Sequence, residues 1–173
     1  MPAKLEPDPE PDSPRDVIVT ANGWGQPPFV GDAAKMISDQ AIEAIAAQLN
    51  LSADTGLALL LADNATLRQL NLDHRGKDQQ TNVLSFPAFH PDKLPESGHL
   101  GDIAIALETI IQESLDARKP PLHHLAHMVV HGVAHLAGYD HNNDAEAGEM
   151  EAIEICALAR LGITNPYQDR NDV

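Results

Sequence analysis

The most constraining feature of this chain is the stretch HGVAHLAGYDH at residues 131–141. His131 and His135 are four residues apart, so on an α-helix both imidazoles lie on one side. Gly138 follows three residues later, where helices commonly end in a left-handed residue that glycine adopts at little cost. The chain can then turn back and bring His141 toward the helical pair. Three imidazoles with a fourth coordination position open are typical of a catalytic zinc site.

The spacing HxxxHxxGxxH is also that of metzincin proteases, in which a Glu directly after the first His is the general base. In this chain that position is Gly132, which has no proton acceptor. A metal-bound water would then need another base, or would have to be deprotonated by the metal alone. A zinc metallopeptidase therefore stays an alternative that lacks its catalytic residue.

Composition and charge narrow the class of protein further. The net charge of −15 argues against nucleic-acid binding through a generally basic surface, although it leaves a local basic cleft open. The 43% hydrophobic content with only 3% aromatics predicts a core of Leu, Ile, Val and Ala. No apolar run approaches the ~20 residues of a membrane span, so we expect no membrane association. The single cysteine, Cys156, fits a reducing compartment, and we predict it to be a small buried residue on a helix.

Apolar periodicity and breaker residues predict one α/β (α+β) domain of about four strands and five helices. The segment 1–14 holds five of the thirteen prolines and four acids, which predicts a disordered tail. We expect the domain to span 15–165 and a C-terminal tail to span 166–173. The expected strands are 16–21, 57–62, 81–86 and 100–107, and the expected helices are 32–50, 64–72, 107–118, 121–137 and 143–161. We expect 23–28 to be a loop, the strand 57–62 to be buried on both faces, and Asn64 to cap its helix.

A basic group upstream of the histidines is a candidate phosphate site. Arg75 and Lys77 lie close to Arg68 and His74, and an Arg between a helix and a strand suits a phosphate oxygen because its planar fork donates two hydrogen bonds. A solvated surface explains the same charges, and charge alone does not decide. Four residues of the following strand could line a substrate cleft and hold a substrate backbone by strand addition or hydroxyl contacts: Thr81, Asn82, Ser85 and Phe86.

Acidic and histidine residues near the motif have several interpretations. Asp102 could orient a metal-bound imidazole or only cap a strand, and Asp140 could accept a proton or only cap a turn. We expect Glu154 to be solvated and His127 to lie exposed or at the cleft edge, with a fourth metal ligand as its alternative. The segment 140–154 holds six acids and no Lys or Arg, so RNA would have to approach from the Arg75 side.

The motifs together resemble one family. HGVAHLAGYDH resembles the H-G-x-x-H-L-x-G-Y-D-H signature of the YbeY family of endoribonucleases and rRNA maturation factors. The upstream LNLDHRGKDQQTNVLSFP resembles that family's L-N-x-x-x-R-x-x-x-x-x-T-[DN]-V-L-S-F-P segment, and LGDIAIAL resembles its G-D-I strand. The resemblance runs in order over about residues 51–161. His74 departs from it, because an aromatic residue is expected there.

The resemblance implies a mixed four-stranded sheet and one zinc ion per chain, held by His131, His135 and His141. It implies cleavage of single-stranded RNA, maturation of the 3′ end of the 16S rRNA precursor in ribosome quality control, and association with the ribosome or small-subunit proteins in the bacterial cytoplasm. The family's functional arginine corresponds to Arg75, and Lys77 and Ser85 become candidate substrate contacts. A non-catalytic ribosome-assembly factor with a structural zinc is a further alternative.

Overall fold

The computed structural model describes residues 14–90 and 98–171, so the predicted tail 1–14 falls outside it except for Pro14. The described residues form one α/β domain with a four-stranded mixed sheet and five α-helices, which confirms the expected fold class. In chain order the elements are β1 (Arg15–Val19), η1 (Asn22–Gly25), α1 (Ala33–Gln48), β2 (Thr55–Ala62), α2 (Asn64–Arg75), β3 (Val83–Pro87), β4 (Gly98–Ala106), α3 (Leu107–Asp116), α4 (Pro121–Leu136), α5 (Asp144–Ala159) and η3 (Gln168–Asn171).

The sheet has the strand order β1-β2-β4-β3. β1 pairs with β2 and β2 pairs with β4 in parallel, whereas β3 runs antiparallel to β4 and forms an edge. Ser85 of β3 lies opposite Ile103 of β4, and Phe86 lies opposite Asp102. Because side chains alternate between the two faces of a sheet, these pairs fix which residues of β3 and β4 point toward which layer of helices.

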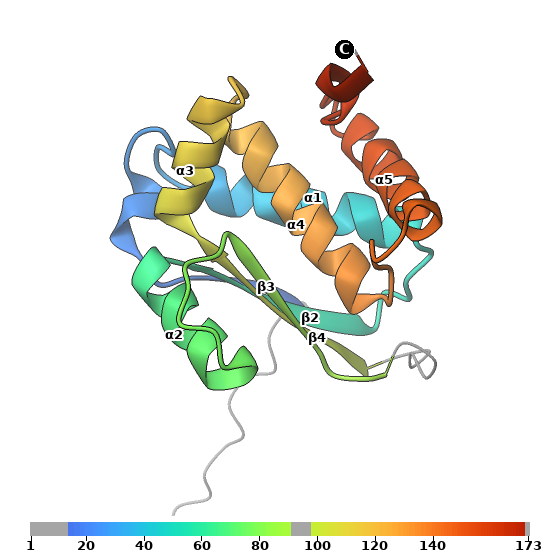
Figure 1. Ribbon diagram of the computed structural model, residues 1–173, viewed down its shortest axis with the longest axis horizontal. Coiled ribbons are helices and arrows are strands. Elements are labelled where there is room, and N and C mark those ends of the chain that lie inside the picture. The colour runs from blue at the N-terminus through green and yellow to red at the C-terminus, as the bar shows by residue number, and fades with distance from the viewer. Residues whose placement is uncertain (1–13, 91–97, 172–173) are drawn as a thin grey trace, which may run out of the picture.

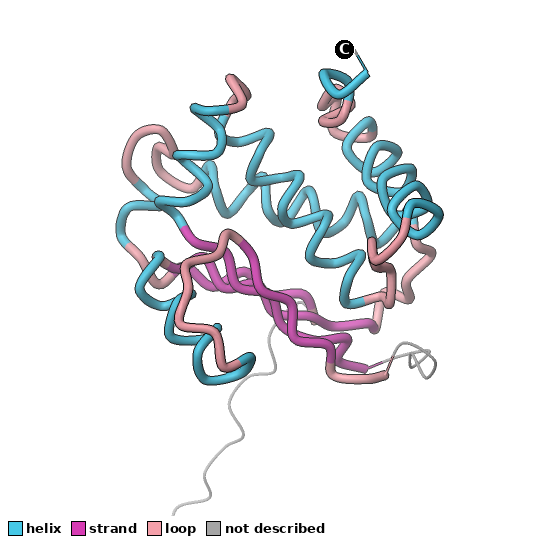
Figure 2. The backbone as a smooth tube through the Cα atoms, in the orientation of Figure 1, coloured by secondary structure: helices cyan, strands magenta, loops and turns pink. Residues whose placement is uncertain are grey.

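Helices cover the two faces of the sheet unequally (Figures 1 and 2). The larger core joins one face of the sheet to α1, α3, α4 and α5, and it contains Leu59 of β2, Ile45 of α1 and Val133 of α4, each fully buried. The smaller core lies under α2, where Leu67 packs against Leu84 and three alanines. The predicted double burial of β2 therefore holds only in part, since Ala58 and Leu60 are half-buried on the face that α2 covers.

Three local expectations are wrong. Asp63, not Asn64, caps α2, because the Asp63 Oδ1 accepts a hydrogen bond from the Thr66 backbone N–H at 2.8 Å. The expected loop 23–28 contains η1, and Trp24 in it is 1% exposed while its indole Nε1–H donates to the Ala62 carbonyl at 2.8 Å. Cys156 lies on a helix as expected but is exposed, because α5 packs against the core through neighbouring positions such as Ala157 and Leu158.

The helix that carries two of the motif histidines begins and ends as its sequence indicates. Pro121 occupies the first helical position of α4, where a missing N–H costs nothing. Gly138 has φ of 96° and ends the helix, and the Tyr139 N–H donates back to the Ala134 carbonyl at 3.1 Å. The chain therefore reverses directly after His135. In the part of the chain that the structure describes, no helix is long and apolar enough to cross a membrane.

Because β3, β4 and α4 approach one another closely at Gly101, we predict that replacing this glycine destabilises the protein. Gly101 has φ of +150°, and a Cβ there would lie 2.4 Å from the Phe86 carbonyl oxygen and 2.8 Å from a Leu136 methyl carbon. We expect Gly101→Ala to lower the free energy of unfolding by about 1–3 kcal/mol, measured by equilibrium chemical denaturation. The matched control is Gly148→Ala in α5, where no atom lies within 4 Å of the added Cβ. That change should stabilise the protein by about 0.5–1 kcal/mol, and equal destabilisation by both would contradict the packing argument.

Candidate metal centre and its cleft

The three motif histidines converge at the end of α4. His131 and His135 are half-buried on the helix, and His141 approaches from the exposed loop that follows Gly138. One ring nitrogen of each lies within 4.8 Å of those of the other two, and the Nε2 atoms of His131 and His135 are 3.0 Å apart. The turn at Gly138 thus brings together the three residues as the spacing predicts, and the group could hold a metal ion.

The hydrogen bonds of the Nδ1 atoms of His131 and His135 determine that their Nε2 atoms are the ones available to a metal ion. The His135 Nδ1 lies 2.9 Å from the Tyr139 carbonyl oxygen, which only accepts, so Nδ1 must carry the proton. The His131 Nδ1 lies 2.7 Å from the Glu154 Oε1 and donates to that carboxylate. Burial, together with the neighbouring His131 and His141, lowers the pKa of His135 and favours its neutral form.

The Nε2 atoms of the two rings therefore face each other across 3.0 Å, close enough to share a proton or a cation. When both rings are neutral, each presents an Nε2 lone pair there, and a metal ion bound between them and His141 would take both as ligands. Neutral imidazole nitrogens whose second nitrogen donates to a carboxylate or a carbonyl are the usual ligand arrangement of zinc. The donor set fits a metal ion that takes nitrogen ligands.

Behind the histidines lies a buried carboxylate that contradicts expectation. Glu154 is 0% exposed rather than solvated, and its Oε2 accepts hydrogen bonds from His127 Nε2 at 2.9 Å and from the Tyr167 hydroxyl. His127, predicted to be exposed or at the cleft edge, is only 8% exposed and lies one helical turn before His131. Burial by itself raises the pKa of Glu154, but the hydrogen bonds from His127, His131 and Tyr167 outweigh it and lower the pKa to about 2.

The sequence does contain a signal for the burial of Glu154. Met150 lies four residues before it, and Ala157 and Leu158 lie three and four residues after it. All three are buried, so the position falls within the apolar stripe of α5. An acid in such a stripe needs partners, and the histidines of α4 supply two of them.

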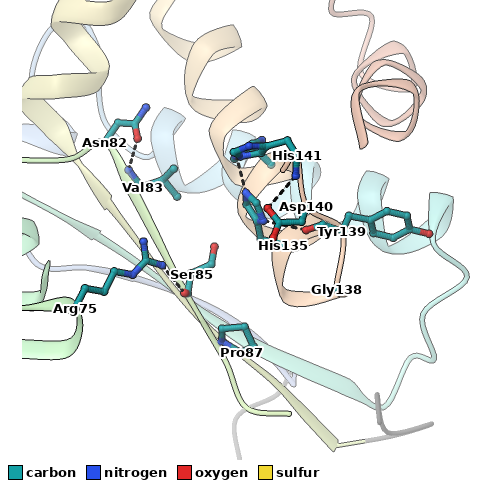
Figure 3. Close-up of a pocket in the computed structure, with 11 residues that line it drawn as sticks. Arg75, Asn82, Val83, Ser85, Pro87, His135, Gly138, Tyr139, Asp140 and His141 are labelled. Carbon is teal, nitrogen blue, oxygen red and sulfur yellow. Dashed lines mark hydrogen bonds between the residues drawn. The ribbon is translucent and has the colours of Figure 1, made fainter. Parts of the chain in front are cut away.

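A cleft of about 490 Å³ opens beside the histidines (Figure 3). One wall is the edge strand β3 with the C-terminal residue of α2, and the other is the end of α4 with the loop that follows it. Its lining residues are Arg75, Asn82, Val83, Ser85, Pro87, His131, His135, Gly138, Tyr139, Asp140 and His141. The cleft thus joins the residues of two separate sequence motifs.

The structure brings four of the other candidate residues to the cleft, namely Arg75, Asn82, Ser85 and Asp140. The Arg75 Nη2 donates to the Ser85 carbonyl at 3.3 Å, which aims the guanidinium at the cleft wall (Figure 3). The Ser85 hydroxyl donates to the Gly132 carbonyl at 3.2 Å and so links β3 to α4. The Asp140 carboxylate accepts from the His141 backbone N–H at 2.8 Å, and this bond, first among several, lowers the pKa of Asp140. Asp140 thereby acts as the cap of the turn that presents His141.

Four candidates lie away from the cleft lining: Thr81, Phe86, Lys77 and Asp102. Lys77 is exposed just beyond the end of α2. Asp102 is exposed and its Oδ1 lies 2.8 Å from the His99 Nε2. The alternation along β4 explains its position, because Ile103 faces the larger core with α4 whereas Ala104 faces α2. Asp102 therefore points to the α2 face, opposite the helix that carries the histidines.

The basic group around Arg75 is smaller in the folded protein than in the sequence. Arg68 forms an ion pair with Asp78, which neutralises it. His74 packs its ring against Phe86 with centroids 4.9 Å apart, and so makes an aromatic contact from the position where an aromatic residue is expected. Arg75 is then the cation that this group contributes to the cleft lining.

Gly132 separates this site from a peptidase site. A Cβ at this position would lie 3.0 Å from the Ile103 Cγ2 and 3.4 Å from the Ser85 Oγ. The helix lies so close to the sheet that a longer side chain does not fit without displacement. At the position where a metzincin carries its general base, the close packing of α4 on the sheet thus leaves no room for a glutamate side chain.

Comparisons with known proteins give a consistent result. The sequence model of the family described as Endoribonuclease YbeY matches residues 27–162. The chain is 45% identical over 161 residues to "Endoribonuclease YbeY" of Bradyrhizobium sp. (strain BTAi1), covering 90% of this chain and 92% of that protein. It is 48% identical over 162 residues to the protein of the same name from Rhodopseudomonas palustris (strain CGA009), covering 90% and 82%. The solution structure of TM1509 from Thermotoga maritima has a similar fold, with a TM-score of 0.55 at 19% identity over 91% of this chain and 97% of that one.

The contact between Glu154 and His131 predicts a role in metal affinity. In Glu154→Gln the amide cannot accept from all three donors, and His131 loses the charge that holds its ring. We expect the dissociation constant for Zn²⁺, measured by competition with a chromogenic chelator, to rise by about 10–100-fold. Glu149→Gln is the control, because it removes the same charge from an exposed position of α5. Equal affinities of the two variants would show that Glu154 does not support the ligand.

The low pKa of Glu154 also predicts acid sensitivity of the metal-free protein. A carboxyl group whose pKa falls from 4.5 to about 2 on folding stabilises the native state above pH 4.5, and this contribution, on the order of 3 kcal/mol, is lost as the pH falls toward 2. Burial lowers the pKa of His127, so its neutral form adds stability above pH 6.5 that is likewise lost in acid. Denaturation at a series of pH values should show a steeper loss below pH 4.5 for the wild type than for Glu154→Gln. Parallel curves would contradict this assignment.

Proposed function

Because the chain belongs to the YbeY family of endoribonucleases, we propose that it is a metal-dependent endoribonuclease specific for single-stranded RNA. We further propose that it acts in maturation of the 3′ end of the 16S rRNA precursor and in ribosome quality control. The observation that carries the proposal is the placement of Arg75 and three converging histidine nitrogens in one cleft.

The proposed metal is zinc, one ion per chain, with His131, His135 and His141 as its ligands. Bound there, zinc would act as a Lewis acid on a phosphoryl oxygen or lower the pKa of a water. The chain's own contribution is to keep each helical imidazole in one tautomer, through the Glu154 carboxylate and the Tyr139 carbonyl. Asp140 holds the turn that presents the third histidine.

Arg75 is the proposed catalytic residue of the chain. A guanidinium has five N–H donors in a rigid fork, and the described contacts of Arg75 use one of them, on the Ser85 carbonyl. The remaining donors can bind the non-bridging oxygens of a phosphodiester and stabilise the charge that develops on them. Ser85 contributes to the substrate wall through its position on β3, and Lys77 is proposed to contact the RNA backbone outside the cleft. Asp102, on the opposite face of the sheet, is left out of the site.

The partners proposed for this protein follow from its family. They are single-stranded RNA and the 16S rRNA precursor, together with the ribosome or small-subunit proteins, in the cytoplasm. The chain is strongly acidic, so we expect RNA to bind through a small basic contact at Arg75 rather than through a broad basic surface. Glu151 and Glu154 of α5 line the cavity on the other side of the histidines, where they repel phosphate.

The two alternatives have less support. A metallopeptidase needs a base next to His131, and Gly132 packs against the sheet there. A purely structural zinc is usually enclosed by four protein ligands, whereas His141 is exposed and the cleft of about 490 Å³ opens onto the histidines.

The proposal predicts the behaviour of two variants toward a single-stranded fragment of the 16S rRNA 3′ end. We expect His135→Ala to abolish cleavage by removing a ligand, and Arg75→Ala to lower the turnover number by about 10²–10³-fold while zinc binding is retained. Arg160→Ala, an exposed arginine of the same charge at the end of α5, is the matched control and should cleave like the wild type.

Three outcomes would overturn the proposal. Equal cleavage by all four proteins would point to a contaminating nuclease and favour the assembly factor. Unfolding on removal of zinc, without any cleavage in the loaded form, would indicate a structural ion. Hydrolysis of an unfolded protein substrate would favour the peptidase.

A further inference from the structure

A second cavity lies on the other side of the histidines. It has a volume of about 320 Å³ and lies between α4 and α5, which are neighbours in the fold (Figure 1). His131 and His141 line both this cavity and the cleft that contains Arg75. The metal centre therefore lies between two cavities. A polymer bound across the three histidines can place one of its groups in each cavity.

The charge of the second cavity favours a neutral group over a phosphate. Its lining includes Glu151 and Glu154, and the segment from Pro120 to Ala159 contains no Lys or Arg. An anionic phosphodiester is stabilised on the Arg75 side and repelled on this one. A neutral part of a nucleotide, its base or its sugar, meets no such penalty.

The remaining lining residues select among neutral groups. Ala147 and the aromatic Tyr167, both half-buried, provide apolar and polarisable surface, and Met150, which is 1% exposed, contributes only a small part of it. The hydroxyl of Tyr167 bonds to Glu154, so the position of its ring is fixed. Methionine and aromatic surfaces suit the flat face of a nucleobase, and the volume lies at the lower end of the ~300–1,000 Å³ typical of small-ligand sites.

We propose that the cavity between α4 and α5 is a nucleobase subsite, which takes the base of a nucleotide next to the phosphodiester bound at the histidines and Arg75. The inference rests on the proposed nuclease function and extends it. A base can enter the cavity only if it leaves its stack and its pairing partner, and this costs least in a single strand. The subsite thereby supplies a physical basis for selecting single-stranded RNA.

Modified substrates test the subsite without altering the protein. The bond that the wild type cuts in a short RNA is mapped first, and abasic nucleotides are then placed singly on its 5′ and its 3′ side. We expect an abasic nucleotide on one side to lower kcat/KM by about tenfold or more, and one on the other side to have a much smaller effect. Equal, small effects on both sides would overturn the proposal.

A variant that fills the cavity gives the complementary test. Ala147→Phe should raise KM for the intact RNA by about tenfold, and the abasic substitution should cost this variant nothing further, because both changes remove one contact. Ala152→Phe, on the exposed side of the same helix, should behave like the wild type. Ala147→Leu, a smaller change, serves if thermal unfolding shows that the Phe variant is misfolded.

Failure of the subsite and failure of the nuclease function have different signatures. If the wild type cleaves RNA and both Ala147→Phe and Ala152→Phe cleave it equally well, the subsite is refuted while the function stands. If zinc-loaded wild type cleaves no RNA, the function is refuted. Binding measured by fluorescence anisotropy then decides the subsite. It stands if the wild type binds intact RNA more tightly than abasic RNA, and if Ala147→Phe binds intact RNA more weakly than the wild type does. Any other result refutes it.

Discussion

The structure around α4 is arranged to hold the Nε2 atoms of two imidazoles together at a separation of 3.0 Å. Neither ring would keep that orientation alone, since a neutral histidine can exchange its tautomer or rotate. The carbonyl of Tyr139 fixes one ring, and the buried carboxylate of Glu154 fixes the other. The carboxylate in turn is stable in the interior only because three donors compensate its desolvation. Helix termination, helix–helix packing and the C-terminal Tyr167 all serve this one contact.

A second constraint is the distance between α4 and the sheet. Gly132 lets the helix approach β3 and β4 until the Ser85 hydroxyl reaches a helix carbonyl. The same approach brings the edge strand, with Arg75 bound to its Ser85 carbonyl, next to the histidines. The three histidines and Arg75 come from segments about sixty residues apart in the chain, and helix–sheet packing sets their relative positions.

The sequence predicts those parts of the site that follow from local geometry. A helical repeat, a terminating glycine and a return loop are sufficient to place His131, His135 and His141 together. The sequence does not predict which face of the sheet carries the Asp102 side chain. Apolar residues occupy both faces of β4, so the pattern does not distinguish the face that packs against α4. For Glu154 the sequence offers only its place in the apolar stripe of α5. An acid on a helix is normally solvated, and the tertiary contacts with His127, His131 and Tyr167 make its burial possible. Cys156 is the opposite case, because a small residue that we expect to be buried on α5 is instead exposed to solvent.

The edge position of β3 has a consequence for how copies of this protein behave toward one another. The Asn82 carbonyl and the Ala88 N–H bond to β4, so the backbone groups of Val83, Ser85 and Pro87 face away from the sheet. Such an edge is normally a template on which a strand of another molecule can add. Here the Val83 N–H donates to the Asn82 side chain, the Ser85 carbonyl accepts from Arg75, and Pro87 has no N–H. The groups that build the cleft wall thus also leave the open edge fewer backbone donors and acceptors for intermolecular strand pairing.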